Sequence, residues 1–459
     1  MKRAWIGVAC LVAGCGASQT KIVVPVAERW TLAPPAHDEA APQPTAAFWD
    51  RFACAELRTL LNAAATSSLE TASAAARVAR DEALERVARA PLYPTLGAEV
   101  VGAGQSANST RGERGVFLDL GLVAAYEVDV WGRAAKQADA SEARSSASRY
   151  ERASVALAVA AGVADTYFEV LSLRERATRG RANLTATQRV LEIVEAKHAA
   201  GAALAREVSQ QRALVASEAV RVEQFAQAEA EARVSLAIAS GRLPHEIKVQ
   251  NESLDAVTDP TIVPTDVGVP ATLLARRPDI ARAEAQLAAS QADVSAARAA
   301  LWPKLRLNAR AAYQSVFLSD YYDGSAWLAT GLAELSYPIF DGGALSGERD
   351  AAAARRVEAE AEYRRIVLTA VGEVERALRA LDGVHRQSEQ QRVLVDEARR
   401  AFQLIELEYQ AGAGELVAVL DAQRTLFRAE DDLTLMRLGK LRATVALMKA
   451  LGGGWSERR

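Results

Sequence analysis

The chain has 459 residues, of which 50% are hydrophobic and 25% are charged, so it can hold two or three ordinary domains or one very elongated domain. This composition excludes a disordered polymer, which would carry far fewer apolar residues. The formal net charge of −3 gives no reason to expect nucleic acid as a partner, and no strongly basic face stands out.

The first residues are typical of an exported lipoprotein. Lys2 and Arg3 precede an apolar run that is too short to span a bilayer, which predicts a secretory signal peptide over residues 1–14. The run ends in VAGC, which resembles a bacterial lipobox, so we expect Cys15 to be acylated and to begin the mature chain. An ordinary signal peptide with a chance cysteine is the alternative. Because Gly16 is not the aspartate typical of inner-membrane retention, the outer membrane is favoured.

The mature chain begins with an extended segment. Residues 15–47 are rich in Pro, Ala and Thr and show no periodicity, which predicts a tether. Cys10 belongs to the signal peptide and Cys15 is the predicted lipid site, so Cys54 has no partner for an internal disulfide. Packing and association must therefore stabilise the fold.

Alternating apolar and polar residues predict strands with one apolar and one polar face. From Val116 to Val130 the apolar residues occupy the even positions, and polar or small residues occupy many odd ones. From Lys304 to Gln314 the parity is reversed. Residues 96–102 and 327–339 are weaker strands of the same kind.

A polar loop joins the two strands of each pair, over 104–115 and over 315–326. Strands of about ten residues with one apolar face are typical of a transmembrane β-barrel. Four strands cannot close a barrel without leaving open edges in lipid, so several chains must contribute. A soluble sandwich is the alternative, but few other strands exist to form its second sheet.

Two long stretches without proline predict very long helices. No proline lies between Pro94 and Pro244 or after Pro338, and the stretches 134–200 and 347–411 are rich in strong helix formers. Each helix would extend about 100 Å. A 4-3-4-3 spacing of apolar residues in the second stretch predicts packing against another helix, and a plain dimeric coiled coil is the alternative. These residues are Val367, Val371, Val374, Leu378 and Leu381.

Residues that recur after about 210 positions indicate that the chain contains an internal repeat of one structural unit. The pairs are Pro94 with Pro303, Gly132 with Gly342, Gly162 with Gly372, and Gly201 with Gly412. Gly132 and Gly342 end the second strand of each unit. Gly201 and Gly412 lie where each long helix stops and a second helical pattern begins, which predicts two hairpin tips.

This repeat divides the rest of the chain, with each unit reading as two strands followed by two helices. We expect a helical segment over 48–90, repeat 1 over 91–245, a linker and helix over 246–299, repeat 2 over 300–452, and a C-terminal tail over 453–459.

The segment VPATLLARRPDIARAE (269–284) between the repeats resembles the TolC-like outer-membrane factors, in the lipoprotein branch that serves RND-type tripartite efflux pumps. Supporting stretches are FWDRF (48–52), YEVDVWGR (126–133), YPIFDGG (337–343) and AVLDAQRTL (418–426). The resemblance covers essentially the whole mature chain. It implies a homotrimer that combines a transmembrane barrel of twelve strands with a coiled-coil tunnel of twelve long helices in the periplasm.

The resemblance also implies a function. The trimer would be a passive exit duct for small molecules such as drugs and toxic compounds, driven by an inner-membrane transporter through a periplasmic adaptor that docks at the tips near Gly201 and Gly412. Two alternatives stay open, a duct for type I protein secretion and a lipid-anchored periplasmic coiled-coil scaffold that conducts nothing.

Family positions carried over to this chain imply a gate at the periplasmic end. Asp421 matches an acidic residue that rings the closed end, while a second acidic position falls at Ala418; a solvated helix carboxylate is the alternative for Asp421. Tyr409 and Glu207 match a tyrosine and an acid that bond across the two hairpins. The arginine that assists this bond in the family falls at Gly414, so we expect a closed end that is held more loosely.

The sequence contains no recognisable catalytic or metal-binding motif. Its four histidines lie in unrelated contexts, and no HExxH, GxSxG or Walker sequence is present. We therefore expect no enzymatic activity, no cofactor and no metal site. The energy for transport would have to come from the partner pump.

Overall fold

The computed structural model places the elements in the order that the repeat predicts, with two strands and two long helices in each half of the chain. The signal peptide, Cys15, most of the tether, most of both polar loops, part of the inter-repeat segment and most of the C-terminal tail lie outside the residues that it describes. The described residues are 30–31, 46–106, 114–259, 270, 276–315, 327–453 and 455.

The strands form one antiparallel sheet in the order β1-β2-β3-β4. They are β1 (Thr95–Ser106), β2 (Arg114–Val128), β3 (Lys304–Ser315) and β4 (Trp327–Ser336). Pairing of β2 with β3 joins the two repeats, and β1 and β4 are the edges. The fourth strand ends at Ser336 rather than near residue 339, because Pro338 cannot donate a ladder hydrogen bond.

The register explains the reversed parity of β2 and β3. Leu120 lies opposite Tyr313, and Leu122 lies opposite Ala311. Because cross-strand partners point to the same face, the even residues of β2 and the odd residues of β3 form one apolar face. The alternation in the sequence predicted one apolar face for each strand, and the register shows that the apolar faces of β2 and β3 lie on the same side of the sheet.

The long helices match in length between the repeats. The first helices, α3 (Arg133–Ala199) and α8 (Ala344–Gln410), have 67 residues each. The second helices, α4 (Ala205–Ala239) and α9 (Leu416–Ala450), have 35 residues each. At about 1.5 Å per residue, the longer pair extends about 100 Å, as the proline-free stretches predicted.

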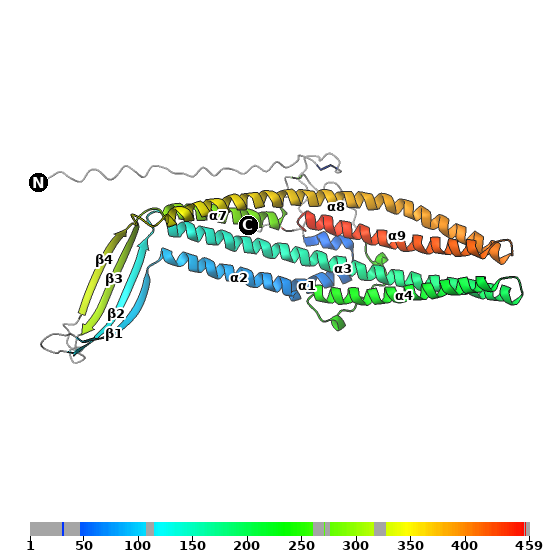
Figure 1. Cartoon of the computed structure of the whole chain (residues 1–459), viewed down its shortest axis with the longest axis horizontal. Coiled ribbons are helices and arrows are strands. Elements are labelled where there is room, and N and C mark those ends of the chain that lie inside the picture. Colours follow the sequence, from blue (N-terminus) through cyan, green and yellow to red (C-terminus); the bar gives the residue numbers. More distant parts are fainter. Residues whose placement is uncertain are drawn as a thin grey trace.

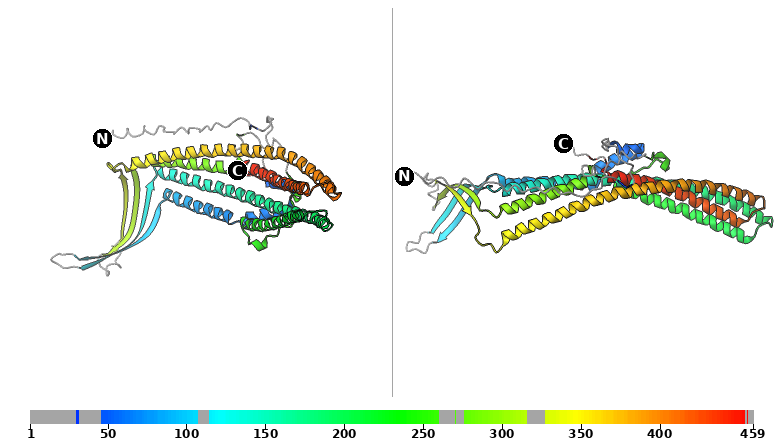
Figure 2. Two further views of the ribbon diagram at one scale, coloured as in Figure 1. Left: turned by 45° about the vertical axis from the view of Figure 1, so that its right-hand side comes forward. Right: turned by 90° about the horizontal axis from the view of Figure 1, so that it is seen from above.

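The molecule is elongated, with the sheet at one end and both hairpin tips at the other (Figure 1). The views in Figure 2 keep this arrangement. In the described residues, three shorter helices complete the layer, α1 (Ala55–Ser67), α2 (Leu69–Arg89) and α7 (Pro278–Ala299). Near the sheet, α2 and α7 flank α3, and α7 also packs on α8; toward the tips, α4 and α9 take over as neighbours.

The largest apolar core lies in the middle of the molecule, where α1, α3, α4 and α9 meet the segment after α4. Tyr167, Phe168 and Leu171 of α3 are fully buried there. By length and composition, α3 contains a stretch apolar enough to cross a membrane, yet 44% of that stretch is buried. Packing in this core accounts for the apolar character of those buried residues.

A buried polar network fastens the segment after α4 to this core. The Tyr167 hydroxyl donates to Glu56 at 2.9 Å and accepts from the Asn251 amide at 2.7 Å. Free Cys54 is buried beside it, with 3.4 Å between its sulfur and the Tyr167 hydroxyl. Arg174 donates to the carbonyls of Val249 and Asn251 at 2.7 and 2.9 Å. The start of the inter-repeat segment is therefore held to α1 and α3.

Part of the predicted tether is docked on the helices. Trp30 is buried in a second core that contains Ile280 of α7 and Val367 of α8. The Thr31 amide and hydroxyl both donate to the Glu375 carboxylate, at 2.7 and 2.9 Å. Thr31, which follows Cys15 closely in the sequence, thus fixes the chain on α8.

Candidate functional site

The two hairpin tips are built alike. Gly201 and Gly412 follow the long helices with φ angles of +74° and +83°, which side chains rarely adopt. Gly201 N–H donates to the His198 carbonyl at 2.9 Å, and Gly412 N–H donates to the Tyr409 carbonyl at 3.1 Å. These bonds satisfy carbonyl groups that a helix end would otherwise leave unpaired. Figure 1 shows both tips at the end of the molecule opposite the sheet.

Tyr409 lies in a small core that joins the two hairpins. Its side chain is buried, at 5% exposure, among apolar residues of both hairpins. Those neighbours include Val190 and Val194 of α3, Val208 of α4 and Leu416 of α9. Burial raises the pKa of the Tyr409 hydroxyl, and the negative charge of Glu207 raises it further. The predicted gate residues Tyr409 and Glu207 are therefore close enough to interact electrostatically.

Glu207 makes a different hydrogen bond from the one that the resemblance implied. Its carboxylate accepts from the Leu204 amide at 3.1 Å and caps the start of α4. Within the described residues, the Tyr409 hydroxyl has no hydrogen-bond partner. The tips bring these two side chains near each other without a hydrogen bond between them.

Gly414, at the position of the family's assisting arginine, lies against the backbone of Tyr409. A Cβ atom at Gly414 would lie 3.1 Å from the Tyr409 nitrogen. The turn after α8 is therefore folded tightly onto the last turn of that helix, and it leaves little room for an arginine side chain.

A lysine that the sequence did not single out crosses between the hairpins. Lys197, in the last turn of α3, donates to the Tyr409 carbonyl at the end of α8. Its ammonium group also lies 4.0 Å from the centroid of the Tyr409 ring. A basic residue in the last turn of α3 was visible in the sequence as a helix-capping signal, but its partner was not.

Asp421 lies on α9, in an open groove of about 560 Å³ between α4 and α9. Gln210 and Ala213 of α4 line the opposite wall, and Arg424 lies one turn further along α9. The Asp421 side chain is exposed, and the part of the chain that the structure describes gives its carboxylate no ion pair or hydrogen bond. This carboxylate is therefore available to ions in solution.

The polar face of the sheet carries ion pairs. Arg310 pairs with Asp119 on the neighbouring strand and approaches Glu99 on β1 to 3.7 Å. Arg306 lies 3.7 Å from Glu127 on the same face. Leu96, Val100, Leu120, Leu122, Leu307 and Leu335, which are large apolar residues of the opposite face, are all exposed.

Exposed aromatic residues gather where the strands meet the helices. The rings of Trp131 and Trp302 stack with 5.0 Å between their centroids, and the Trp131 indole donates to the Pro303 carbonyl at 2.7 Å. Tyr93 and Phe340 are exposed at the same junction, before β1 and after β4. Aromatic side chains in such a position are typical of a membrane–water interface.

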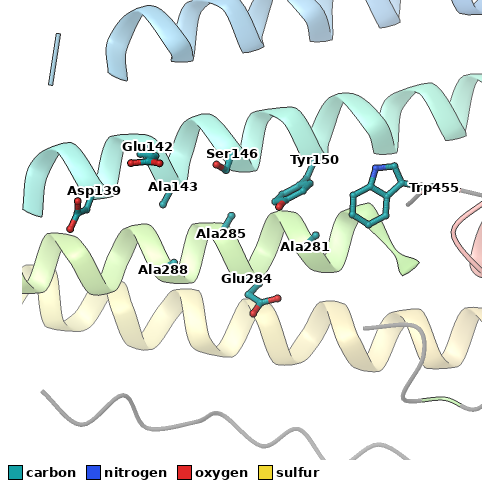
Figure 3. Close-up of a pocket in the computed structure, with 10 residues that line it drawn as sticks. All are labelled: Asp139, Glu142, Ala143, Ser146, Tyr150, Ala281, Glu284, Ala285, Ala288 and Trp455. Carbon is teal, nitrogen blue, oxygen red and sulfur yellow. The ribbon is translucent and has the colours of Figure 1, made fainter. Parts of the chain in front are cut away.

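Another groove, of about 680 Å³, lies between α3 and α7 and is shown in Figure 3. It contains two carboxylates of α3, but Asp139 pairs with Lys136 at 2.7 Å and Glu142 pairs with Arg89 at 2.9 Å. Across the described residues, no group of three or more His, Cys, Asp or Glu side chains could hold a metal ion. Small residues form much of its lining, and two of its three carboxylates are paired, the third being Glu284 of α7.

The two halves of the chain each match the model of the outer membrane efflux protein family, over residues 60–242 and 269–453. The chain therefore belongs to that family. It is 42% identical over 430 residues to the pyoverdine export outer membrane protein OpmQ of Pseudomonas aeruginosa, covering 90% of this chain and 88% of that protein.

Another relative and a solved structure support the same conclusion. The chain is 31% identical over 405 residues to the toluene efflux pump outer membrane protein TtgF of Pseudomonas putida, covering 87% of this chain and 83% of that protein. Its fold matches the open state of the MtrE outer membrane channel of Neisseria gonorrhoeae with a TM-score of 0.84 at 26% identity, covering 94% and 96% of the two chains.

The protein is thus an outer-membrane component of an efflux system, with the fold of a TolC-like channel. The motif at 269–284, in the segment that joins the two repeats, predicted this class, and the comparisons confirm it. The edges of its sheet, its exposed apolar face and its paired tips are the features that bear on how it works.

Proposed function

We propose that three copies of this chain form one barrel in the outer membrane and one tunnel in the periplasm, and that this tunnel is a passive exit duct. The supporting observation is the sheet, which has one exposed apolar face and two unpaired edges. An open edge in lipid leaves backbone groups without partners. Pairing β1 of one copy with β4 of the next removes these edges, and four strands in each of three copies give twelve strands.

The lipid-facing and water-facing sides follow from the register. Apolar residues such as Leu120 and Leu307 would face acyl chains, while ion-paired residues such as Arg310 and Asp119 would line the water-filled interior. The aromatic residues near Trp131 would lie at the periplasmic surface of the membrane. Acylation of Cys15 would add a lipid anchor beside the barrel, tied to the helices through Trp30.

The tips at Gly201 and Gly412 would be the docking points for a periplasmic adaptor, because they are the ends of the helical layer farthest from the sheet (Figure 1). An inner-membrane transporter would supply the energy through this adaptor. Cargo would pass without chemical change. Three copies of Asp421 around a narrow end would favour cations there.

The cargo would be a class of small molecule rather than one compound. The relative from Pseudomonas aeruginosa is named for pyoverdine export and the one from Pseudomonas putida for toluene efflux. We propose that this chain carries small molecules of this range, including drugs and toxic compounds. Disrupting its gene should sensitise cells to such compounds or lower the amount of an exported compound in the medium. Loss of a secreted protein instead would favour a type I secretion duct.

Conductance in planar bilayers tests the duct itself. The purified protein should form trimers that dissociate on heating and should conduct ions. Replacing Asp421 with Asn should lower the selectivity for cations, because the acidic ring is removed. A non-conducting periplasmic scaffold would give neither trimeric barrels nor currents, and that outcome would refute the proposal.

A further inference from the structure

We propose that Lys197 is a positioning residue that straps the two hairpins of one chain together at the periplasmic end. This inference rests on the proposed duct, whose closed end the strap would hold. The two residues that it joins are 212 positions apart in sequence, one at the end of α3 and the other at the end of α8. Each lies in the last turn before a hairpin tip.

Two contacts of one ammonium group make the strap. Lys197 Nζ donates to the Tyr409 carbonyl, and it also lies 4.0 Å from the centroid of the Tyr409 ring. The Tyr409 carbonyl already accepts the Gly412 N–H at 3.1 Å, so Lys197 adds a second hydrogen bond to this oxygen. The partial negative charge at the C-terminal end of a helix favours a cation there. The face of an aromatic ring attracts the same charge. Both contacts therefore favour the position that Lys197 occupies.

The environment strengthens these contacts. Tyr409 is buried in the core that joins the hairpins, so little water competes for its ring. Within the described residues, no carboxylate forms an ion pair with Lys197. Glu207, whose negative charge raises the pKa of Tyr409, is engaged with the Leu204 amide. Lys197 is thus the side chain whose charge spans the gap between α3 and α8.

The strap would also join the hairpins in a chain that has Gly414 where the family has an assisting arginine. Position 414 is a glycine packed onto the Tyr409 backbone, and the Tyr409 hydroxyl has no hydrogen-bond partner in the described residues. The first hairpin therefore supplies the connection: its Lys197 donates a hydrogen bond to the main chain of the second hairpin. Separating the tips requires breaking both contacts of Lys197.

Replacing Lys197 with Met tests this role, because methionine keeps the apolar stem and removes the ammonium group. The separated state of the tips should become about tenfold more populated in Lys197→Met. Amide hydrogen exchange in the last turns of α3 and α8 should accelerate by the same factor. Lys197→Arg, which keeps a cation and its donors, should retain most of the protection.

Arg206 provides a matched control, since it is an exposed cation in the first turn of α4 at the same tip. Arg206→Met removes the same charge from the same end of the tunnel and should leave both exchange and conductance unchanged. Unchanged exchange in Lys197→Met would refute the strap, as would equal acceleration in Arg206→Met. If no variant conducts, including the unmodified protein, the duct fails, and exchange still decides the strap.

Conductance supplies the functional measurement on the full-length protein in planar bilayers. Lys197→Met should open more often or to a higher level than the unmodified protein, and Lys197→Arg should restore its behaviour. A conducting channel whose currents are identical in all these variants would show that the tips do not separate through Lys197.

Discussion

Arg277 donates a hydrogen bond to Glu373 at 2.8 Å and thereby joins the start of α7 to the middle of α8. The same guanidinium donates to Asp279 through two nitrogens, at 3.0 and 2.7 Å, and to the Ala450 carbonyl at 2.9 Å. Its side chain is only 8% exposed. The RRPD stretch that carried the family resemblance is therefore a joint where the inter-repeat segment, α8 and the end of α9 meet.

Removing this joint should destabilise the fold. Arg277→Ala leaves Asp279 and Glu373, which are 32% and 40% exposed, without their shared donor, so the loss of these charged hydrogen bonds should cost about 1–3 kcal/mol. Arg277→Lys should recover little of the loss, because an ammonium group cannot reach Asp279, Glu373 and Ala450 at once. The midpoint of thermal unfolding, followed by circular dichroism in detergent, measures both effects. Arg386→Ala, which removes an exposed pair on α8, should change that midpoint little.

Acid should weaken the same joint through Asp279. Burial alone would raise the pKa of this carboxyl, but the hydrogen bonds and charge of Arg277, with backbone donors at the start of α7, lower it overall. A carboxyl with a lowered folded pKa stabilises the fold above its unfolded value of about 3.9, and this stabilisation is lost as pH falls through the folded pKa. The thermal midpoint should therefore fall between about pH 5 and pH 2 less steeply in Asp279→Asn than in the unmodified protein.

Asp350→Asn is the control for this pH dependence, since Asp350 pairs with Arg349 on the surface of α8. Its profile should follow that of the unmodified protein. Parallel profiles for the unmodified protein and for Asp279→Asn would show that the Arg277–Asp279 pair does not contribute to acid sensitivity.

Two glycines should respond in opposite ways to replacement by alanine. Gly452 has a φ of +94°, and a Cβ atom there would lie 2.0 Å from the Arg276 carbonyl oxygen. Gly452→Ala should therefore lower the thermal midpoint by displacing the RRPD segment. Gly347 in α8 has no atom within 4 Å of such a Cβ, so Gly347→Ala should stabilise the helix by about 0.5–1 kcal/mol. Equal effects at the two positions would contradict the packing at Gly452.

Local patterns predicted the scaffold because their physical causes are local. Alternation determined which residues of β2 and β3 share a face, and the absence of proline in long runs of helix formers predicted α3 and α8. Apart from Asp279, the partners of Arg277 lie 96 and 173 residues away, and that of Lys197 lies 212 residues away. Such contacts depend on how the two repeats pack against each other, and a periodic pattern within one repeat carries no information about that packing. The tips were therefore predicted, whereas the lysine that joins them was not.

The two faces of the sheet can be tested with matched neighbours. Spin labels at Leu120 and Leu307 should report hydrocarbon when the protein is in lipid, and labels at Asp119 and Arg306 should report water. Collision with oxygen and with a water-soluble nickel complex distinguishes the two environments. Water at Leu120 and Leu307 together with hydrocarbon at Asp119 and Arg306 would overturn the proposed barrel.

The role of Tyr409 can be divided between its hydroxyl and its ring. The hydroxyl has no hydrogen-bond partner in the described residues, whereas the ring packs in the core between the hairpins and lies over the Lys197 ammonium group. Tyr409→Phe keeps the ring and the main-chain carbonyl, so the conductance of the channel should stay close to that of the unmodified protein.

Tyr409→Ala should raise the conductance, because it empties the small core and exposes Lys197 to water, at a cost of about 3–5 kcal/mol for an aromatic residue. Single-channel recordings of both variants, made beside the unmodified protein, separate the two mechanisms. A high conductance in Tyr409→Phe would mean that the hydroxyl bonds to Glu207 in the closed trimer, and the ring would then not be what holds the tips. A low conductance in Tyr409→Phe with a high one in Tyr409→Ala would assign the closure to packing and to the lysine strap.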